Sequence, residues 1–207
     1  MSGIGVLALQ GAFIEHIKML RSLGAEAVEV RLPHELGDLQ GLIIPGGEST
    51  TIGKLATTYG LIEPIKEMAG RGKPIWGSCA GLILLAKNVE GMQQPLIGVM
   101  DLTVRRNAFG RQVDSFEADI PVHVLQTVSE PNEKSRPFHA VFIRAPLILS
   151  VGEGMEVLSR LTDGRIAAAR QGSLLATAFH PELTNDTRFH RYFLKMVDES
   201  EGAAEVG

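Results

Sequence analysis

The first half of the chain alternates short apolar runs with segments of helical periodicity. Four runs are typical of strands in a buried sheet, namely GIGVLAL (3–9), AEAVEV (25–30), GLIIPGG (41–47) and PIWGS (74–78). Helical spacing of apolar residues follows in residues 12–24, in 49–72 with a break near Gly60, and in 80–87. This alternation predicts a mostly parallel sheet with helices on both faces.

The second half consists of shorter, turn-punctuated segments, which predicts more strands and partly antiparallel pairing. The segments are IGVMDLTV (97–104), SFEADIPVHVL (115–125), AVFIRAP (140–146), MEVLSRL (155–161), RIAAARQ (165–171) and SLLATAF (173–179). Residues 187–197 predict a closing amphipathic helix, and the polar residues 129–137 predict a surface loop. No linker divides the chain. We therefore expect a single-domain, three-layer α/β sandwich over residues 1–199 and a flexible tail over 200–207.

Composition limits the partners and the compartment more than the fold. The 207 residues carry a net charge of −4, which gives no electrostatic reason to expect nucleic acid or an anionic membrane as partner. A single cysteine excludes an internal disulfide and favours a reducing, cytoplasmic location. The first apolar run is short and has no basic residues before it, so we expect a strand and not a signal peptide. No apolar stretch reaches the ~18–20 residues of a membrane helix.

The single cysteine, Cys79, lies where a predicted strand turns into a predicted helix. Gly77-Ser78-Cys79-Ala80-Gly81 has the Gly-x-nucleophile-x-Gly pattern of a nucleophile elbow, with sulfur in place of a serine oxygen. The helix start favours a thiolate, and the backbone N–H of Ala80 would face a developing oxyanion. The alternative is a buried, inert cysteine at a tight helix–sheet contact.

A cysteine nucleophile needs a general base, and His180 is the best-placed candidate. His180 ends the apolar run 173–179, at the expected carboxyl edge of the sheet, and Pro181 and Glu182 follow it. The Glu182 carboxylate would hold the imidazole in the useful tautomer and stabilise its charged form. A capping histidine beside a solvated glutamate is the alternative for this motif alone.

The other five histidines are expected to have no catalytic role. His16 shares a helix face with Glu15 and Lys18, so we expect it to be solvated. The remaining four are assigned to loops, a mixed strand and the last helix, and they are His34, His123, His139 and His190.

A Gly46-Gly47 turn ends the third apolar run, within IPGGEST (44–50). Such a turn can aim backbone N–H groups at an oxyanion, although simple tight turns have the same composition. Gly3-x-Gly5 precedes its strand and lacks a third glycine, which excludes a dinucleotide fingerprint. The sequence has no phosphate-binding P-loop and no cluster at metal-ligand spacing, so no metal is expected.

Taken together, the elbow cysteine, the Gly-Gly turn and the late His-Pro-Glu resemble class I (triad) glutamine amidotransferases. Within that class the chain is similar to the glutaminase subunits of pyridoxal 5′-phosphate synthase, over about residues 3–197. The similar motifs are LALQGAFIEH, LIIPGGEST, GSCAGLILLA, VRRNAFGRQVDSFE, VFIRAP and ATAFHPEL. Residues 123–138 are longer and more polar than the family pattern.

The resemblance implies hydrolysis of glutamine to glutamate and ammonia through a Cys79 thioester, with His180 moving protons and Glu182 orienting it. The ammonia would pass to a separate (β/α)₈-barrel synthase subunit in a large hetero-oligomer. Pyridoxal 5′-phosphate would be the product of that complex, and this chain would need no cofactor. Gly47 and Ala80 match the oxyanion positions. The glutamine contacts would be Gly47, Glu48, Ser49, Arg106, Ile143 and Arg144, with Gln10, Gly46 and Asn107 as supporting residues.

Three alternatives remain open to the sequence. An independent cysteine hydrolase or peptidase would turn over small amides without a preference for glutamine. The glutaminase half of a different synthase, such as that of the histidine pathway, would bind a different partner. A non-catalytic binding module would lack one member of the triad, and none is missing here.

Overall fold

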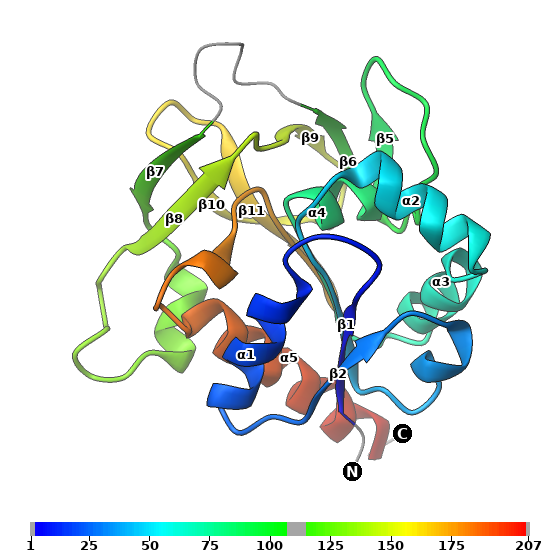
Figure 1. Ribbon diagram of the computed structural model, residues 1–207. Helices are drawn as coiled ribbons and strands as arrows, with labels where there is room; N and C mark the ends of the chain where they lie inside the picture. The colour runs from blue at the N-terminus through cyan, green and yellow to red at the C-terminus, as the bar shows by residue number, and fades with distance from the viewer. Residues whose placement is uncertain (1–2, 107–114, 206–207) are drawn as a thin grey trace.

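The computed structural model describes residues 3–106 and 115–205, with side chains as far as residue 202. Ten strands form one sheet in the order β2-β1-β3-β4-β12-β11-β9-β6-β5, with β10 paired to β11 beside this path (Figure 1). These strands are β1 (Ile4–Leu7), β2 (Ala27–Val30), β3 (Gly41–Ile44), β4 (Ile75–Ser78), β5 (Ala86–Val89), β6 (Met100–Arg105), β9 (Leu147–Val151), β10 (Glu156–Arg160), β11 (Ile166–Gln171) and β12 (Leu174–Thr177). A separate antiparallel pair contains β7 (Ser115–Ile120) and β8 (Phe138–Ile143).

Helices cover both faces of the sheet, as the alternating pattern predicts. They are α1 (Phe13–Ser22), α2 (Ser49–Thr58), α3 (Ile62–Gly70), α4 (Ala80–Leu85) and α5 (Arg188–Glu205), with short 3₁₀ turns η1 (Pro33–Leu36), η2 (His123–Val128) and η3 (Pro181–Leu183). Helices α1 and α5 lie on one side of the sheet, and α2 and α3 lie on the other (Figure 1). The three-layer α/β sandwich is therefore confirmed. In the described part of the chain, no helix combines the length and apolar character needed to cross a membrane.

The four apolar runs of the first half form β1, β2, β3 and β4, all parallel to their neighbours. The strand β12 comes from the far end of the chain and pairs with β4, also in parallel. Every residue of β1, β3, β4 and β12 is buried, because helices cover both faces, and this explains their unbroken apolar sequences. The break predicted near Gly60 separates α2 from α3, and Gly60 has φ +70°.

Two short strands differ from the sequence prediction. The helix predicted over 80–87 ends at Leu85, and β5 begins at Ala86 because that residue is extended (ψ 141°) and pairs with Met100 of β6. The second, β9, was not predicted, and it joins β6 to β11. Residues 123–128 form η2 and not a strand. The surface loop predicted over 129–137 is confirmed as a run of turns between η2 and β8.

The C-terminal prediction is also wrong in part. The helix predicted over 187–197 continues to Glu205, so residues 200–205 of the predicted tail are helical, and 206–207 lie outside the described residues. The added turns are rich in glutamate and alanine and contain no proline, and the helix continues through the one weak helix former among them, Gly202.

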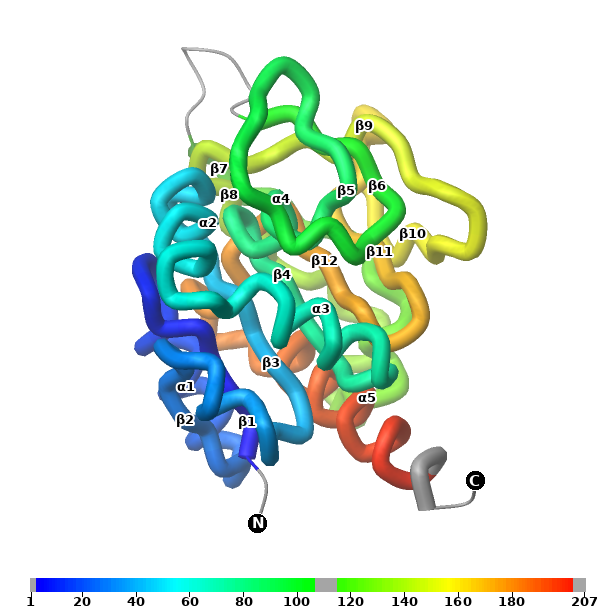
Figure 2. The backbone as a smooth tube through the Cα atoms, turned by 90° about the vertical axis from the view of Figure 1, so that its right-hand side faces the viewer, coloured from blue at the N-terminus to red at the C-terminus, as the bar shows by residue number. Residues whose placement is uncertain are grey.

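The common direction of the parallel strands determines at which end of the sheet the candidate site lies. The first strand begins, and α5 ends, at the same end of the molecule (Figure 2). The carboxyl ends of β3, β4 and β12 therefore meet at the opposite end. In an open parallel sheet, ligands gather beyond these carboxyl ends.

Candidate active site

Cys79 lies on a strained elbow between β4 and α4. Its backbone is at φ 47° and ψ −102°, a left-handed conformation that is rare for a residue with a side chain. Its N–H donates to the carbonyl oxygen of Thr177 at 2.8 Å, which ties the elbow to β12. A Cβ on Gly81 would lie 2.0 Å from the carbonyl oxygen of Ile44, and a Cβ on Gly77 would lie 2.5 Å from Gly81. Only glycine lets α4 pack this closely on the sheet.

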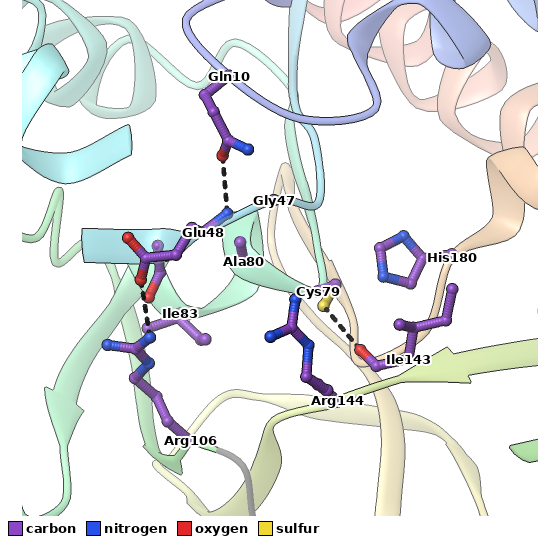
Figure 3. Close-up of a pocket in the computed structure, with 11 residues that line it drawn as sticks. Gln10, Gly47, Glu48, Cys79, Ala80, Ile83, Arg106, Ile143, Arg144 and His180 are labelled. Atoms are coloured by element: carbon purple, nitrogen blue, oxygen red, sulfur yellow. Dashed lines mark hydrogen bonds and ion pairs between the residues drawn. The ribbon is translucent and has the colours of Figure 1, made fainter. Parts of the chain in front are cut away.

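The elbow opens into a pocket of about 250 Å³ (Figure 3). Its lining comes from the ends of β1, β3, β4, β6, β8 and β12 and from the start of α2 and α4. The lining residues are Gln10, Gly47, Glu48, Ser49, Cys79, Ala80, Ile83, Arg106, Ile143, Arg144 and His180. All of these except Ile83 are residues that the sequence analysis singled out. Ile83 lies one turn into α4 and carries no chemical signal, so its position on the pocket wall follows only from the fold.

His180 and Glu182 are hydrogen-bonded at the pocket edge. The Nδ1–H of His180 donates to Oε1 of Glu182 at 2.7 Å, which leaves Nε2 for the Cys79 side. Burial alone would lower the pKa of His180, but the neighbouring Cys79 sulfur and the Glu182 carboxylate raise it to about 10. The raised pKa favours the protonated imidazole, the form that can give a proton to a leaving group.

The interpretation of His16 as a solvated residue is wrong. Its side chain is fully buried between α1 and the sheet, and its Nε2 lies 3.3 Å from Oε2 of Glu182. His190 of α5 is equally buried, and its Nε2 lies 2.9 Å from Nδ1 of His16. The missed signal is spacing: His16 lies three residues after Phe13 and four before Leu20, on the apolar stripe of α1.

The Gly46-Gly47 turn packs directly on the catalytic histidine. The carbonyl oxygen of Gly46 accepts from the N–H of Ala12 at 3.0 Å. A Cβ on Gly46 would lie 2.3 Å from Cε1 of His180, so the turn and the imidazole fit together only with glycine here. The side-chain oxygen of Gln10 accepts from the N–H of Glu48 at 2.7 Å and fixes the residue after the turn.

Glu48 and Arg106 form an ion pair on the pocket wall. The Arg106 guanidinium donates to Oε1 of Glu48 at 2.8 Å and to Oγ1 of Thr50 at 2.7 Å. The Glu48 carboxylate also accepts the N–H groups of Thr50 and Thr51 at the start of α2. Burial would raise the pKa of Glu48, but the hydrogen bonds from Thr51 and Thr50 lower it to about 2. The wall therefore presents a fixed pair of opposite charges.

Arg144 lines the pocket close to the Cys79 sulfur (Figure 3). The Cys79 thiol lies 3.8 Å from the carbonyl oxygen of Ile143, and the next residue, Arg144, has φ 43°. This second strained residue turns the chain after β8 so that the arginine lines the pocket (Figure 3). Asn107, which the sequence analysis named as a supporting residue, lies outside the described residues.

A strained cysteine, a charged imidazole and a buried carboxylate are the parts of covalent acyl transfer, with a thioester as intermediate. Within residues 3–106 and 115–205, no group of three or more His, Cys, Asp or Glu side chains could hold a metal ion.

Comparison with known proteins places the sequence among a defined set of relatives. The profile of the SNO glutamine amidotransferase family matches residues 6–199. The pyridoxal 5′-phosphate synthase subunit PdxT of Herpetosiphon aurantiacus is 62% identical over 196 residues, which covers 92% of this chain and 98% of the relative. The subunits of the same name from Dehalococcoides mccartyi and Niallia circulans are 58% and 53% identical, each covering 95% of this chain and at least 97% of the relative.

Solved structures agree with the sequence relatives. A crystal structure described as a glutamine amidotransferase superposes with a TM-score of 0.86 at 50% identity, covering 95% of this chain and 100% of that one. The structure of PurLQS from Thermotoga maritima has a TM-score of 0.71 at 19% identity, covering 96% and 99%, and supports the fold alone.

Proposed function

Because the chain belongs to the SNO glutamine amidotransferase family, we propose that it hydrolyses L-glutamine to L-glutamate and ammonia. The ammonia serves the synthesis of pyridoxal 5′-phosphate, since relatives at 53–62% identity over nearly their whole length are subunits of that synthase. The observation that carries the proposal is the strained Cys79 beside the hydrogen-bonded pair of His180 and Glu182. The family membership agrees with the resemblance in the sequence motifs, and it favours this function over an independent peptidase or another synthase.

In the first half-reaction, the Cys79 thiolate attacks the side-chain amide carbon of glutamine. The carbonyl oxygen becomes an oxyanion, for which the N–H groups of Ala80 and Gly47 are the proposed donors. The His180 imidazolium gives its Nε2 proton to the amide nitrogen, the carbon–nitrogen bond breaks, and ammonia leaves. A glutamyl thioester on Cys79 remains.

In the second half-reaction, a water molecule replaces ammonia. The neutral His180 takes a proton from this water as it attacks the thioester carbon, and the imidazolium is restored. The carbon–sulfur bond breaks, glutamate leaves, and Cys79 is a thiolate again. Glu182 keeps the Nδ1 proton of His180 in place in both halves, so that Nε2 is the nitrogen that exchanges protons.

Glutamine is a zwitterion at its other end, and the pocket wall carries opposite charges. We assign the α-ammonium to Glu48 and the α-carboxylate to Arg106, which are already paired at 2.8 Å. Such a pair matches the two charges of the zwitterion, and each side chain gains an oppositely charged partner from the substrate. The other proposed contacts are Gly47, Ser49, Ile143 and Arg144, with Gln10, Gly46 and Asn107 as supporting residues.

We also propose a partner subunit and a cellular location for this chain. The relatives are named as one subunit of a synthase, so ammonia needs an acceptor subunit, and we expect a (β/α)₈ barrel within a large hetero-oligomer. A lone catalytic thiol suits the reducing cytoplasm, where it is not oxidised to a disulfide.

The test is glutamate release from glutamine by the purified chain mixed with its cognate synthase subunit. We expect turnover in the wild type, none in Cys79→Ala, and labelling of Cys79 alone by a glutamine-analogue electrophile. Circular dichroism of the variant controls for its fold. Turnover retained in Cys79→Ala, or equal turnover of unrelated small amides, would refute the proposed function.

A further inference from the structure

Two buried imidazoles lie behind Glu182, His16 in contact with it and His190 in contact with His16, and the proposed reaction does not use them. His16 comes from α1 and His190 from α5, two helices on the same side of the sheet (Figure 1). Both side chains are fully buried, and their rings lie 5.4 and 4.9 Å from the ring of Trp76. A polar ring in an aromatic core costs free energy unless its nitrogens are hydrogen-bonded. The hydrogen-bond partners of these ring nitrogens are therefore expected to be well defined.

The contacts form a line that starts at the catalytic pair. Glu182 uses Oε1 for His180 and turns Oε2 toward His16, whose Nε2 is 3.3 Å away. No hydrogen bond of standard geometry reaches that Oε2 from the described residues, so His16 is the donor nearest to it. The same Nε2 lies 3.2 Å from Oγ of Ser78, and Nδ1 of His16 lies 2.9 Å from Nε2 of His190.

One arrangement of protons fits these contacts. Burial lowers the pKa of His16 and of His190, so both rings are neutral and each carries one N–H. With the proton of His16 on Nε2, this N–H donates to Oγ of Ser78 at 3.2 Å and places its positive end 3.3 Å from Oε2 of Glu182, and Nδ1 accepts from His190. The atom left over is Nδ1 of His190, an unprotonated nitrogen with no partner among the described residues.

The opposite arrangement, with the protons of His16 and His190 both on Nδ1, is less favourable in free energy for two reasons. It would set the lone pair of His16 Nε2 against the charged Oε2 of Glu182 at 3.3 Å. It would also leave a buried N–H on His190 without an acceptor, and orphaned N–H groups are rarer than orphaned acceptors.

We propose that His16 is a positioning residue for the glutaminase reaction, holding the second oxygen of Glu182, and that His190 fixes the tautomer in which it does so. The proposal rests on the proposed function, because it assigns these residues through Glu182 to His180. The hydrogen bond to His180 at Oε1 and the electrostatic attraction of the His16 N–H 3.3 Å from Oε2 together favour the orientation of the carboxylate that faces the imidazole. The line His190–His16–Glu182–His180 joins α5 and α1 to the nucleophile Cys79.

The first test compares two substitutions at one position. His16→Phe keeps a ring in the core but leaves Oε2 of Glu182 without a donor, whereas the amide N–H of His16→Gln can replace Nε2–H. With the synthase subunit present, we expect kcat of His16→Phe to fall about 10- to 100-fold with KM for glutamine unchanged. His16→Gln is expected to recover most of kcat. Phe193→Leu, which removes packing on Trp76 from α5 but no member of the line, is the matched control.

The second test is the pH profile of kcat. Burial would raise the pKa of Glu182, and the charge and hydrogen bond of His180 lower it. The N–H dipole of a neutral His16 beside Oε2 also favours the carboxylate, so His16→Phe is expected to move the acid limb of the profile to higher pH. The other titratable groups around His16 are His190 on α5 and Glu15 on its own helix. Phe193→Leu is expected to keep the wild-type profile even if it unfolds at a lower temperature.

A double-mutant cycle tests the role of His190. His190→Phe alone is expected to lower kcat, and to lower it no further in the His16→Phe background, because the line is already broken there. Fully additive losses would overturn the role of His190.

Other outcomes separate this inference from the proposed function. A wild-type kcat and acid limb in His16→Phe would overturn the positioning role, as would a His16→Gln enzyme no better than His16→Phe. Failure of the proposed function would instead show as a wild type that releases no glutamate. In that case the rate at which iodoacetamide alkylates Cys79 still reports the thiolate–imidazolium pair. An unchanged pH dependence of alkylation in His16→Phe would then overturn the positioning role separately.

Discussion

Gly81→Ala is the sharpest perturbation that the geometry of the elbow allows. The added Cβ would lie 2.0 Å from the carbonyl oxygen of Ile44 and 2.8 Å from its carbonyl carbon. Real Cβ contacts essentially never fall under 3.0 Å, so the two segments must separate by about 1 Å. The obstacle is backbone of the buried strand β3, which is paired with both β1 and β4 and cannot rotate away as a side chain would.

Gly81→Ala changes the free energy of unfolding in two opposite ways, and the larger of the two decides the outcome. Replacing a helical glycine by alanine stabilises a helix by roughly 0.5–1 kcal/mol. Overpacking a core costs about 1–3 kcal/mol. The clash is therefore expected to win, and for a chain of this size each kcal/mol lowers Tm by roughly 2–4 °C.

The catalytic effect is expected to be larger than the loss of stability suggests. Separation of α4 from β3 displaces the Cys79 thiolate and the Ala80 N–H together. A 1 Å misplacement in a catalytic site can cost about 10²-fold. We therefore expect kcat of Gly81→Ala to fall by about 100-fold at temperatures well below its Tm.

The assays are thermal unfolding followed by circular dichroism and glutamate release with the synthase subunit present. Gly70→Ala is the matched control, since Gly70 is also helical but nothing lies within 4 Å of an added Cβ. We expect this control to be neutral or slightly stabilising and fully active. Equal Tm and turnover in Gly81→Ala and Gly70→Ala would refute the close-packing account of the elbow.

Three further predictions concern charge. Glu182→Gln is expected to lower kcat by up to about 10⁴-fold and His180→Asn by more, in the same steady-state assay; wild-type turnover in Glu182→Gln would refute its orienting role. Arg106→Ala is expected to weaken glutamine binding by about 10- to 150-fold, measured by calorimetry on a Cys79→Ala background, and unchanged binding would remove it from the substrate site. Because burial lowers the pKa of His16 and His190, the unfolded chain binds more protons than the fold below pH 6.5. The free energy of unfolding is therefore expected to fall as the pH is lowered below 6.5, by at most about 1.4 kcal/mol per pH unit for each histidine. Urea titrations at a series of pH values measure this slope, which is expected to be shallower in His190→Phe.

The sequence determined what depends on near neighbours along the chain. The buried parallel strands were predictable because helices on both faces force unbroken apolar runs such as 41–44. The elbow at Cys79 was predictable because its turn tolerates only small residues, and His180 with Glu182 because two residues across a proline lie close in any fold.

The tertiary structure decided the strands and side-chain contacts that depend on residues distant in the sequence. The strands β5 and β9 exist because β6 offers each an edge, a fact that no local pattern contains. His16 shows the same limit for side chains: helical spacing places it on the apolar stripe of α1, but spacing cannot say what lies opposite. Only packing of α1 and α5 on one side of the sheet brings His16, His190 and Glu182 together, from positions up to 174 residues apart. Hydrogen bonds act over about 3 Å, so such a line of contacts is set by tertiary packing and leaves no periodic trace in the sequence.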